Sequence, residues 1–349
     1  MEKCQENMKL AKTIFTDDGR ILLSAGIALK RSFIERLKLC NLSEVYIDDE
    51  FSTDIEINDV VDERTRNEAK LLVKSVMEEY KVTQRFDADR VKSVVNRIID
   101  ELLYTRDIMV NLTDIKSSDD YTFSHSVNVC ILSLITGIKL GLNQLRLKDL
   151  GIGALMHDIG KTLIPKEILN KASKLTNEEF EQIKKHTILG HEILKTNRDI
   201  SITSAHVAIA HHERYDGSGY PLGTKGDNIH QFARIVAIAD VYDALSSDRV
   251  YRKKMKPHEV LEYMLTAGEV LFDRNILEHF VRSIAIYSIG TSVVLNTGER
   301  GIVVDVNRTF PTRPIVRVVI DAGGKRLASF NEIDLTKRLN VFIEDTCDI

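Results

Sequence analysis

The stretch LRLKDLGIGALMHDIGK, residues Leu145 to Lys161, decides how the central part of this chain folds. Three apolar positions recur in it at the spacing of one helical face: Leu147, Leu150 and Ala154. The pair His157-Asp158 continues that face, so the pattern predicts a helix that points an imidazole and a carboxylate into an apolar core. Gly160 is expected to end this helix.

Further histidines and an aspartate occupy similar places along the chain. From about Leu112 to Ser288 the sequence reads as successive helices, and Thr176 with Glu179 forms a capping-box pattern that opens one of them. The candidate ligands near helix ends or on inner faces are His125, His157, Asp158, His186, His211, His212 and Asp240. Facing helices of a bundle are a known framework for dinuclear sites. We therefore predict a mainly α fold, with a helical bundle around a metal centre.

The donor types indicate which metal this centre prefers. Imidazole nitrogens mixed with carboxylates, without a nearby thiolate, suit Fe, Mn or Zn better than Mg or Ca. The four cysteines are scattered along the chain: Cys4, Cys40, Cys130 and Cys347. They lack the spacing of a zinc ribbon and the density of a secreted scaffold, so we expect free thiols in a reducing compartment.

Two regions before the bundle have a different character. Residues 1–56 are predicted to form a small α+β unit, with strands at Ile14-Phe15 and Ile21–Leu23 around an Asp17-Asp18-Gly19 turn. A helix over Ser32–Leu39 and a strand at Val45–Ile47 complete it. Residues 57–111 form a helical linker or dimerisation region, because Asp62–Tyr104 is charged and helical, with one apolar face. A homodimer is one reading of that face.

The region after the bundle is rich in β-forming residues. Residues 112–288 are assigned to the bundle domain and residues 289–349 to a small β-barrel-like unit. Its expected strands are Thr291–Leu295, Gly301–Val306 and Ile315–Ile320. Asn296-Thr297-Gly298 and Ala322-Gly323-Gly324 are predicted turns rather than phosphate loops, because neither has the spacing of a phosphate loop leading into a helix.

Charge and hydropathy argue against a polynucleotide substrate and against a transmembrane segment. Lys plus Arg number 48 against 52 Asp plus Glu, a formal net charge of −4, so no basic field favours a polynucleotide substrate. No apolar run reaches the length of a transmembrane segment, and the first residues lack the pattern of a signal peptide. We expect a cytoplasmic protein.

Five blocks of sequence, in order, carry a resemblance to a known family. They are Tyr121–Val129, His157-Asp158-Ile159-Gly160-Lys161, Lys185-His186, His211 to Pro221 and Phe232–Asp240. The fourth block reads HHERYDGSGYP and ends in Gly219-Tyr220-Pro221, a rare segment so soon after a double histidine. The chain resembles the HD-GYP phosphodiesterases, a branch of the HD phosphohydrolase superfamily that cleaves cyclic di-GMP in bacteria. The resemblance covers roughly Tyr121 to Asp273.

This resemblance implies a function and a set of roles. His125, His157, Asp158 and Asp240 hold one divalent metal, and Asp158, His186, His211 and His212 hold a second, with Asp158 as the bridge. The metals are Fe or Mn, with Zn as the alternative, and they activate a bridging hydroxide that hydrolyses cyclic di-GMP to pGpG, GMP or both. Lys161 contacts the scissile phosphate, while Arg249 and Arg252 hold the other phosphate. Some relatives bind a third metal through a Glu, but Tyr121 stands at that position, so we expect two.

Plainer readings stand beside these roles. His191, His206, His230, His258 and His279 are expected to be hydrogen-bonded core residues. Lys161 is also explicable as a cation at a helix C-terminus, and Arg249 and Arg252 as part of a solvated basic face. Gly219-Tyr220-Pro221 shapes a loop, which in this family is also proposed to contact signalling-protein partners.

Three hypotheses about function follow. The first is a metal-dependent cyclic di-GMP phosphodiesterase. The second is a non-catalytic sensor of a cyclic dinucleotide or of redox state, which binds without turnover and signals through a protein partner. The third is a hydrolase of another cyclic dinucleotide, such as cyclic GMP-AMP, because the identified residues coordinate metal and phosphate but leave the bases unread.

Overall fold

The computed structural model describes residues 4–16, 20–39, 45–48, 51–52, 54–55, 60–104, 121–171, 173–247, 255–307 and 309–347. The chain divides into two compact units. A helical unit comprises Val61–Ile108 and Ser118–Ser283, and a mixed unit comprises Met1–Val60, Met109–Ser117 and Ile284–Ile349. Arg249 and Arg252, the predicted substrate arginines, lie outside the described residues, as do Cys40 and the Asp17-Asp18-Gly19 turn.

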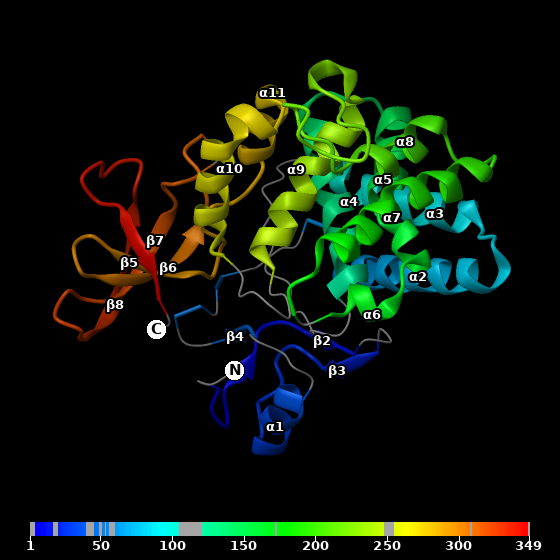
Figure 1. The fold of residues 1–349 in the computed structure, drawn as a ribbon. Helices are drawn as coiled ribbons and strands as arrows, with labels where there is room; N and C mark the ends of the chain where they lie inside the picture. The colour runs from blue at the N-terminus through cyan, green and yellow to red at the C-terminus, as the bar shows by residue number, and fades with distance from the viewer. Residues whose placement is uncertain are drawn as a thin grey trace. The chain divides into compact units, whose positions relative to one another are not determined.

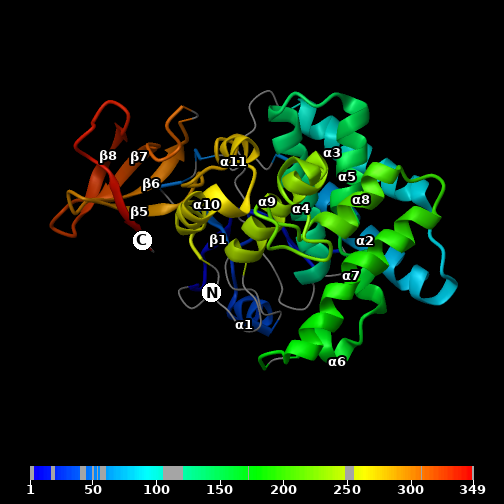
Figure 2. The same ribbon diagram turned by 45° about the horizontal axis from the view of Figure 1, so that its top comes forward.

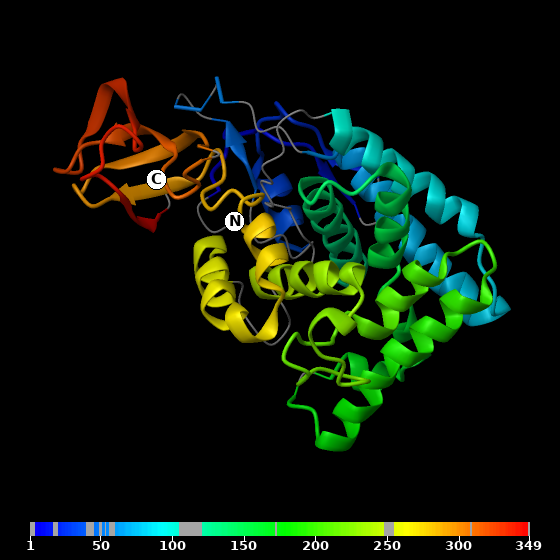
Figure 3. The same cartoon turned by 90° about the horizontal axis from the view of Figure 1, so that it is seen from above.

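The helical unit is a bundle, which confirms the predicted fold class for the central part of the chain (Figure 1). Its elements are α2 (Glu63–Thr83), α3 (Ala88–Tyr104), α4 (Tyr121–Lys139), α5 (Gln144–Leu155), η2 (Ile159–Leu163), α6 (Lys166–Leu169), α7 (Asn177–Thr196), α8 (Ile202–Ala210), η3 (Gly226–Asn228), α9 (Gln231–Ser246), α10 (Pro257–Leu271) and α11 (Arg274–Val281). The predicted helical region Asp62–Tyr104 is two helices, α2 and α3, which lie side by side (Figure 3).

Helix α4 is at the centre of this bundle and packs against α2, α5, α9 and α11 (Figure 2). Its side chains from His125 to Ile135 are buried all round the helix. A helix that is apolar on every side must be covered on every side, which explains its central place. The predicted capping box of Thr176 and Glu179 is present at the start of α7.

The mixed unit contains short β elements and one five-stranded antiparallel sheet. Its elements are β1 (Lys9–Leu10), β2 (Ile14–Phe15), β3 (Ile21–Leu23), α1 (Arg31–Leu39), β4 (Ile47–Asp48), β5 (Ser292–Leu295), β6 (Arg300–Asp305), β7 (Ile315–Ile320), β8 (Arg326–Asp334) and β9 (Ile343–Thr346). The large sheet has the order β8-β7-β6-β5-β9, and within the described residues its outer strands β8 and β9 do not pair. The expected barrel-like unit is therefore an open sheet.

Several sequence expectations for the mixed unit are confirmed. The β2–β3 hairpin and helix α1 form as expected, while the predicted strand at Val45–Ile47 begins only at Ile47. Strands β8 and β9 were not predicted from the sequence. Most residues of β8 are exposed, so its sequence shows no apolar alternation. The turn at Gly298 connects β5 to β6, with a positive φ of 85° that glycine adopts readily. None of the described helices has the length and apolar character needed to cross a membrane.

Candidate metal centre

The structure brings all seven candidate ligands together inside the helical unit. They come from five places in the fold: α4 (His125), the turn after α5 (His157 and Asp158), α7 (His186), the end of α8 (His211 and His212) and α9 (Asp240). Six of the seven are buried, and His212 is partly exposed. Among the described residues, two groups hold ligand atoms within 4.8 Å of one another: His186 with His211 and His212, and His125 with His157 and Asp158.

The His157-Asp158 pair does not lie on the helix that its periodicity predicted. Helix α5 ends at Leu155, and the pair lies in a turn between α5 and η2. Gly160 lies inside η2 and does not end α5, so that prediction is wrong. A Cβ at Gly160 would come within 1.9 Å of the His186 carbonyl oxygen, so glycine permits η2 to lie against the backbone of α7.

Three of the histidines are oriented by the backbone of their own segment. Nδ1 lies 2.7 Å from the Ala154 carbonyl in His157, 2.7 Å from the Ile183 carbonyl in His186 and 2.9 Å from the Ala208 carbonyl in His211. A carbonyl only accepts, so each Nδ1 carries the proton, and in a neutral ring Nε2 keeps its lone pair. Each Nε2 is therefore available as a metal ligand.

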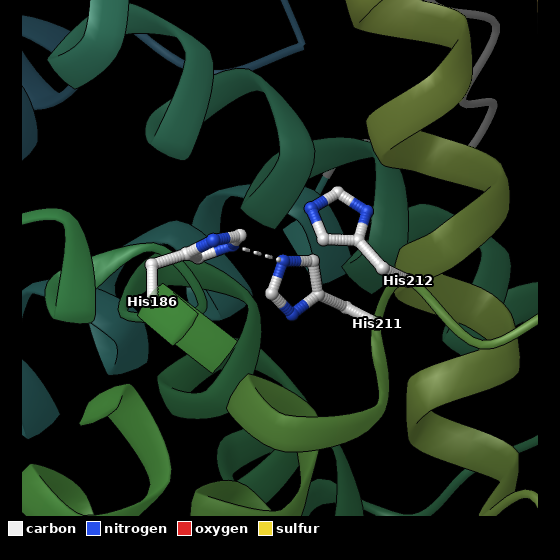
Figure 4. A group of neighbouring side chains, drawn as sticks. All are labelled: His186, His211 and His212. Atoms are coloured by element: carbon white, nitrogen blue, oxygen red, sulfur yellow. Dashed lines mark hydrogen bonds between the residues drawn. The ribbon is translucent and has the colours of Figure 1, made fainter. Parts of the chain in front are cut away.

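His186 and His211 face each other with these lone pairs. Their Nε2 atoms are 3.4 Å apart, as the dashed line in Figure 4 shows, and the ring of His212 lies beside that of His211. With both protons on Nδ1, no proton remains between the two nitrogens. The two lone pairs therefore repel each other, and a cation bound by both nitrogens would relieve this repulsion.

Asp158 lies between the two groups of histidines. Its Oδ1 is 3.3 Å from His186 Nε2 and 3.8 Å from His211 Nε2. Its Oδ2 is 3.3 Å from His157 Nε2 and 3.9 Å from His125 Nε2. One carboxylate thus presents one oxygen to each group, as expected of a residue that bridges two cations.

His125 is held by a carboxylate instead of a carbonyl. Its Nδ1 lies 2.7 Å from Asp243 Oδ2, while its Nε2 lies 3.0 Å from Asp240 Oδ1. Asn128 donates from Nδ2 to the other oxygen of Asp243 at 2.7 Å. A carboxylate behind a ligating histidine fixes the ring and increases its basicity. Sequence reasoning missed Asp243 and Asn128, although each lies one helical turn after a candidate ligand.

The pKa values favour the protonation states that metal binding requires. Burial lowers the pKa of His186 to about 4 and that of His212 to about 3, and burial also lowers the pKa of His211. These rings are neutral at physiological pH. Burial opposes the charge of Asp158, but the Lys161 ammonium and the neighbouring histidines together outweigh burial and hold the pKa of Asp158 well below its usual range.

His125 is the exception among the histidines. Burial lowers its pKa, but the hydrogen bonds to Asp240 and Asp243 outweigh burial and raise the pKa to about 9. A cation at Nε2 would take the place of a proton there, while Nδ1–H would keep its bond to Asp243.

Two buried atoms support a metal in this cluster. His157 Nε2 and Asp158 Oδ1 are buried and lack a hydrogen bond of good geometry within the described part of the chain. Buried polar atoms are normally paired, so unpaired ones need an explanation. Five imidazoles and two carboxylates without a thiolate fit borderline divalent cations, and the residues present therefore fit the expected metals.

Lys161 and the Gly219-Tyr220-Pro221 segment lie at the edge of the cluster. Lys161 Nζ is 2.5 Å from Asp158 Oδ2, and its side chain is partly exposed. The Tyr220 ring packs on the His212 ring with centroids 4.8 Å apart. A Cβ at Gly219 would come within 2.3 Å of the Arg214 amide nitrogen, so glycine is needed for the loop to fold back on itself.

The chain matches known families in two segments. Residues 113–276 match the HD domain, and residues 292–349 match the KOW domain associated with HD domain. The HD match contains all seven candidate ligands and the Gly-Tyr-Pro loop beside them. The central domain is an HD domain of the HD-GYP family.

Relatives of this HD-GYP domain include several named phosphodiesterases. The chain is 35% identical over 257 residues to the cyclic di-GMP phosphodiesterase PA4108 of Pseudomonas aeruginosa, covering 74% of this chain and 62% of that protein. It is 31% identical over 208 residues to the cyclic di-GMP phosphodiesterase PdeB of Borreliella burgdorferi, covering 60% and 55%. It is 38% identical over 196 residues to the 3'3'-cGAMP-specific phosphodiesterase 1 of Vibrio cholerae, covering 54% and 45%. The chain thus spans less than two thirds of each relative.

The fold of this chain is similar to that of a solved structure. It is Bd1817, described as an HDG"Y"P protein, from Bdellovibrio bacteriovorus. The TM-score is 0.51 at 18% identity, and the match covers 79% of this chain and 94% of that chain.

Proposed function

We propose that this protein is a metal-dependent phosphodiesterase that hydrolyses cyclic di-GMP to pGpG, GMP or both. The observation that carries the proposal is Asp158, whose two oxygens face two separate groups of histidines while Lys161 contacts one of the oxygens. A buried carboxylate with this surrounding suits a site for two divalent cations. The names of the relatives supply the substrate class.

Each residue has a role in this proposal. His125, His157, Asp158 and Asp240 would hold one cation, and Asp158, His186, His211 and His212 the other, with Fe or Mn preferred over Zn. Bound there, the two cations would supply the chemistry of a two-metal site: an activated water and neutralisation of a phosphodiester oxygen.

The chain's own residues orient the substrate from the exposed edge of the site. His212 and Lys161 are only partly buried, with side chains 25% and 28% exposed, so the substrate reaches the centre on their side. The Lys161 ammonium would offset the negative charge that grows on the phosphate oxygens as water adds to phosphorus. Arg249 and Arg252 would hold the second phosphate.

A hydrolase of cyclic GMP-AMP is the second candidate. The similarity to the Vibrio cholerae enzyme favours it, and none of the residues placed in the site so far reads a nucleobase. Competition between the two dinucleotides for the same protein separates this candidate from the first.

The test is a combined measurement on one anaerobic preparation of the full chain. Fe, Mn and Zn per chain are measured by elemental analysis, and products from cyclic di-GMP and cyclic GMP-AMP are followed by chromatography. About two metals per chain with turnover of cyclic di-GMP supports the proposal. Binding of metal and of cyclic di-GMP without turnover, even after reconstitution with Fe or Mn, refutes the proposal in favour of a sensor.

A pair of variants assigns the activity to this site. Asp158→Ala removes the carboxylate between the two groups, so turnover should fall to background while the fold survives. Asp149→Ala is the matched control, because Asp149 lies on α5 and bonds to Thr203 on α8, away from the candidate ligands. Activity retained in Asp158→Ala contradicts the site assignment.

A further inference from the structure

A buried arginine on α2 connects to a candidate metal ligand through two other side chains. Arg66 Nη1 donates to Asn128 Oδ1 at 3.5 Å, and Arg66 Nε donates to the Val61 carbonyl at 3.3 Å. Asn128 Nδ2 donates to one oxygen of Asp243, and the other oxygen bonds His125 Nδ1, both at 2.7 Å. These contacts form one continuous buried path from α2 to His125.

The position of Arg66 on its helix is unusual for a charged residue. It is 8% exposed and lies on the buried face of α2, which otherwise consists of uncharged side chains. Arg64, two positions earlier on the exposed side, pairs with Glu68 at 3.4 Å and has a side chain 84% exposed. Burying a guanidinium is costly unless polar partners compensate for lost water. The buried path provides such partners.

Helix α2 lies outside residues 113–276, which match the HD domain. It nevertheless packs against α4, which carries His125 and Asn128, and against η2, which carries Lys161. An arginine from the preceding segment therefore reaches the metal-binding domain through the start of α2.

We propose that Arg66 is a positioning residue for the His125 metal site, supplied by the helix that precedes the HD domain. Its guanidinium holds the Asn128 amide with the oxygen toward α2 and the NH₂ group toward Asp243. Asp243 is thereby fixed to accept the His125 Nδ1 proton, which keeps His125 Nε2 directed at the cation. Through Asn128, the Arg66 guanidinium is also linked to the buried carboxylate of Asp243. The inference rests on the proposed function only in that a metal binds at His125.

The first test compares Arg66→Met with Arg64→Met in the full chain, with Co²⁺ alone as the probe. Co²⁺ affinity is measured by titration, and the visible absorption of the bound ion reports its coordination. Outer partners of metal ligands typically alter affinity by 10–100-fold, and Arg66 acts through two residues, so we expect a loss of about tenfold for one of two ions. The absorption of that ion should change as well. Arg64→Met should match the wild type.

Two more variants separate positioning from a purely structural role. Asn128→Ser interrupts the path, so it should weaken Co²⁺ binding to the same extent, and combining it with Arg66→Met should add little further loss. Arg66→Lys keeps the positive charge but lacks the planar set of N–H donors of the guanidinium, so it should retain part of the Co²⁺ affinity that Arg66→Met loses. If Arg66→Met fails to fold, as judged by circular dichroism, Asn128→Ser and Arg66→Lys decide the question.

The outcomes are distinct from those of the function test. Unchanged Co²⁺ affinity and absorption in folded Arg66→Met overturns the inference, as does full additivity with Asn128→Ser. A wild-type chain that binds Co²⁺ but hydrolyses no cyclic dinucleotide refutes the proposed activity and leaves this comparison intact. A wild-type chain that binds no metal refutes both.

Discussion

The close contact at Gly160 predicts a substitution that damages the metal centre without replacing a candidate ligand. A Cβ at this position would lie 1.9 Å from the His186 carbonyl oxygen, 2.8 Å from its carbon and 2.6 Å from the Gly190 nitrogen. All three are backbone atoms, so no side-chain rotation relieves the clash. Packed interiors offer no spare space into which this Cβ could move. An ordinary contact between the Cβ and the His186 carbonyl oxygen therefore requires η2 and α7 to move apart by roughly 1.5 Å.

This displacement exceeds what a metal site tolerates. Metal–ligand distances vary by only about 0.2 Å in such sites. The displacement would move the backbone of His186, a candidate ligand, relative to Asp158, which lies two residues before Gly160. Gly160→Ala should therefore lose at least one of the two expected metals per chain and nearly all hydrolysis. Overpacking of this kind costs about 1–3 kcal/mol of unfolding free energy, so the variant should melt earlier but still fold.

Two other glycines provide graded controls. A Cβ at Gly190 has its nearest contact at 3.3 Å, with the Gly160 nitrogen, so Gly190→Ala should keep most of its metal. A Cβ at Gly137 meets only the ends of leucine side chains, at 2.9 to 3.2 Å, so Gly137→Ala should lose some stability and no metal. Elemental analysis, hydrolysis and thermal melting are measured on each variant. Two metals and wild-type turnover in Gly160→Ala would refute the reasoning.

Three further predictions follow from the described contacts. His186→Ala should lose about one metal per chain, while His191→Ala on the same helix should keep both, because His191 Nδ1 bonds the Ala205 carbonyl and its ring belongs to neither ligand group; equal losses would contradict the assignment. Burial raises the pKa of the Cys130 thiol, so iodoacetamide at pH 8 should modify it only after unfolding in urea, as mass spectrometry can show. Arg317→Met should lower the melting temperature of the mixed unit by several degrees without changing metal content, because Arg317 forms a two-pronged ion pair with Asp54 at 2.6 and 2.7 Å; an unchanged melting curve would dismiss this pair as a stabilising contact.

The sequence alone determined the helical class of the central domain and the identity of its candidate ligands. Helical periodicity records which face is buried, and donor chemistry records what a buried face can bind. The direction of the ligating nitrogens is also largely local, because His157, His186 and His211 each bond a carbonyl three residues earlier in the chain. Contacts between residues close together in the chain therefore determine much of the geometry of this site.

Tertiary structure decided what local periodicity does not encode. It ended α5 before His157-Asp158, and it made Gly160 a point of contact between two backbones. It brought Arg66, far away in sequence, to Asn128, and it paired the largely exposed strand β8 with β7. These features depend on contacts between residues distant along the chain, whose partners leave no periodic pattern in their own segments. Only the packed fold specifies them.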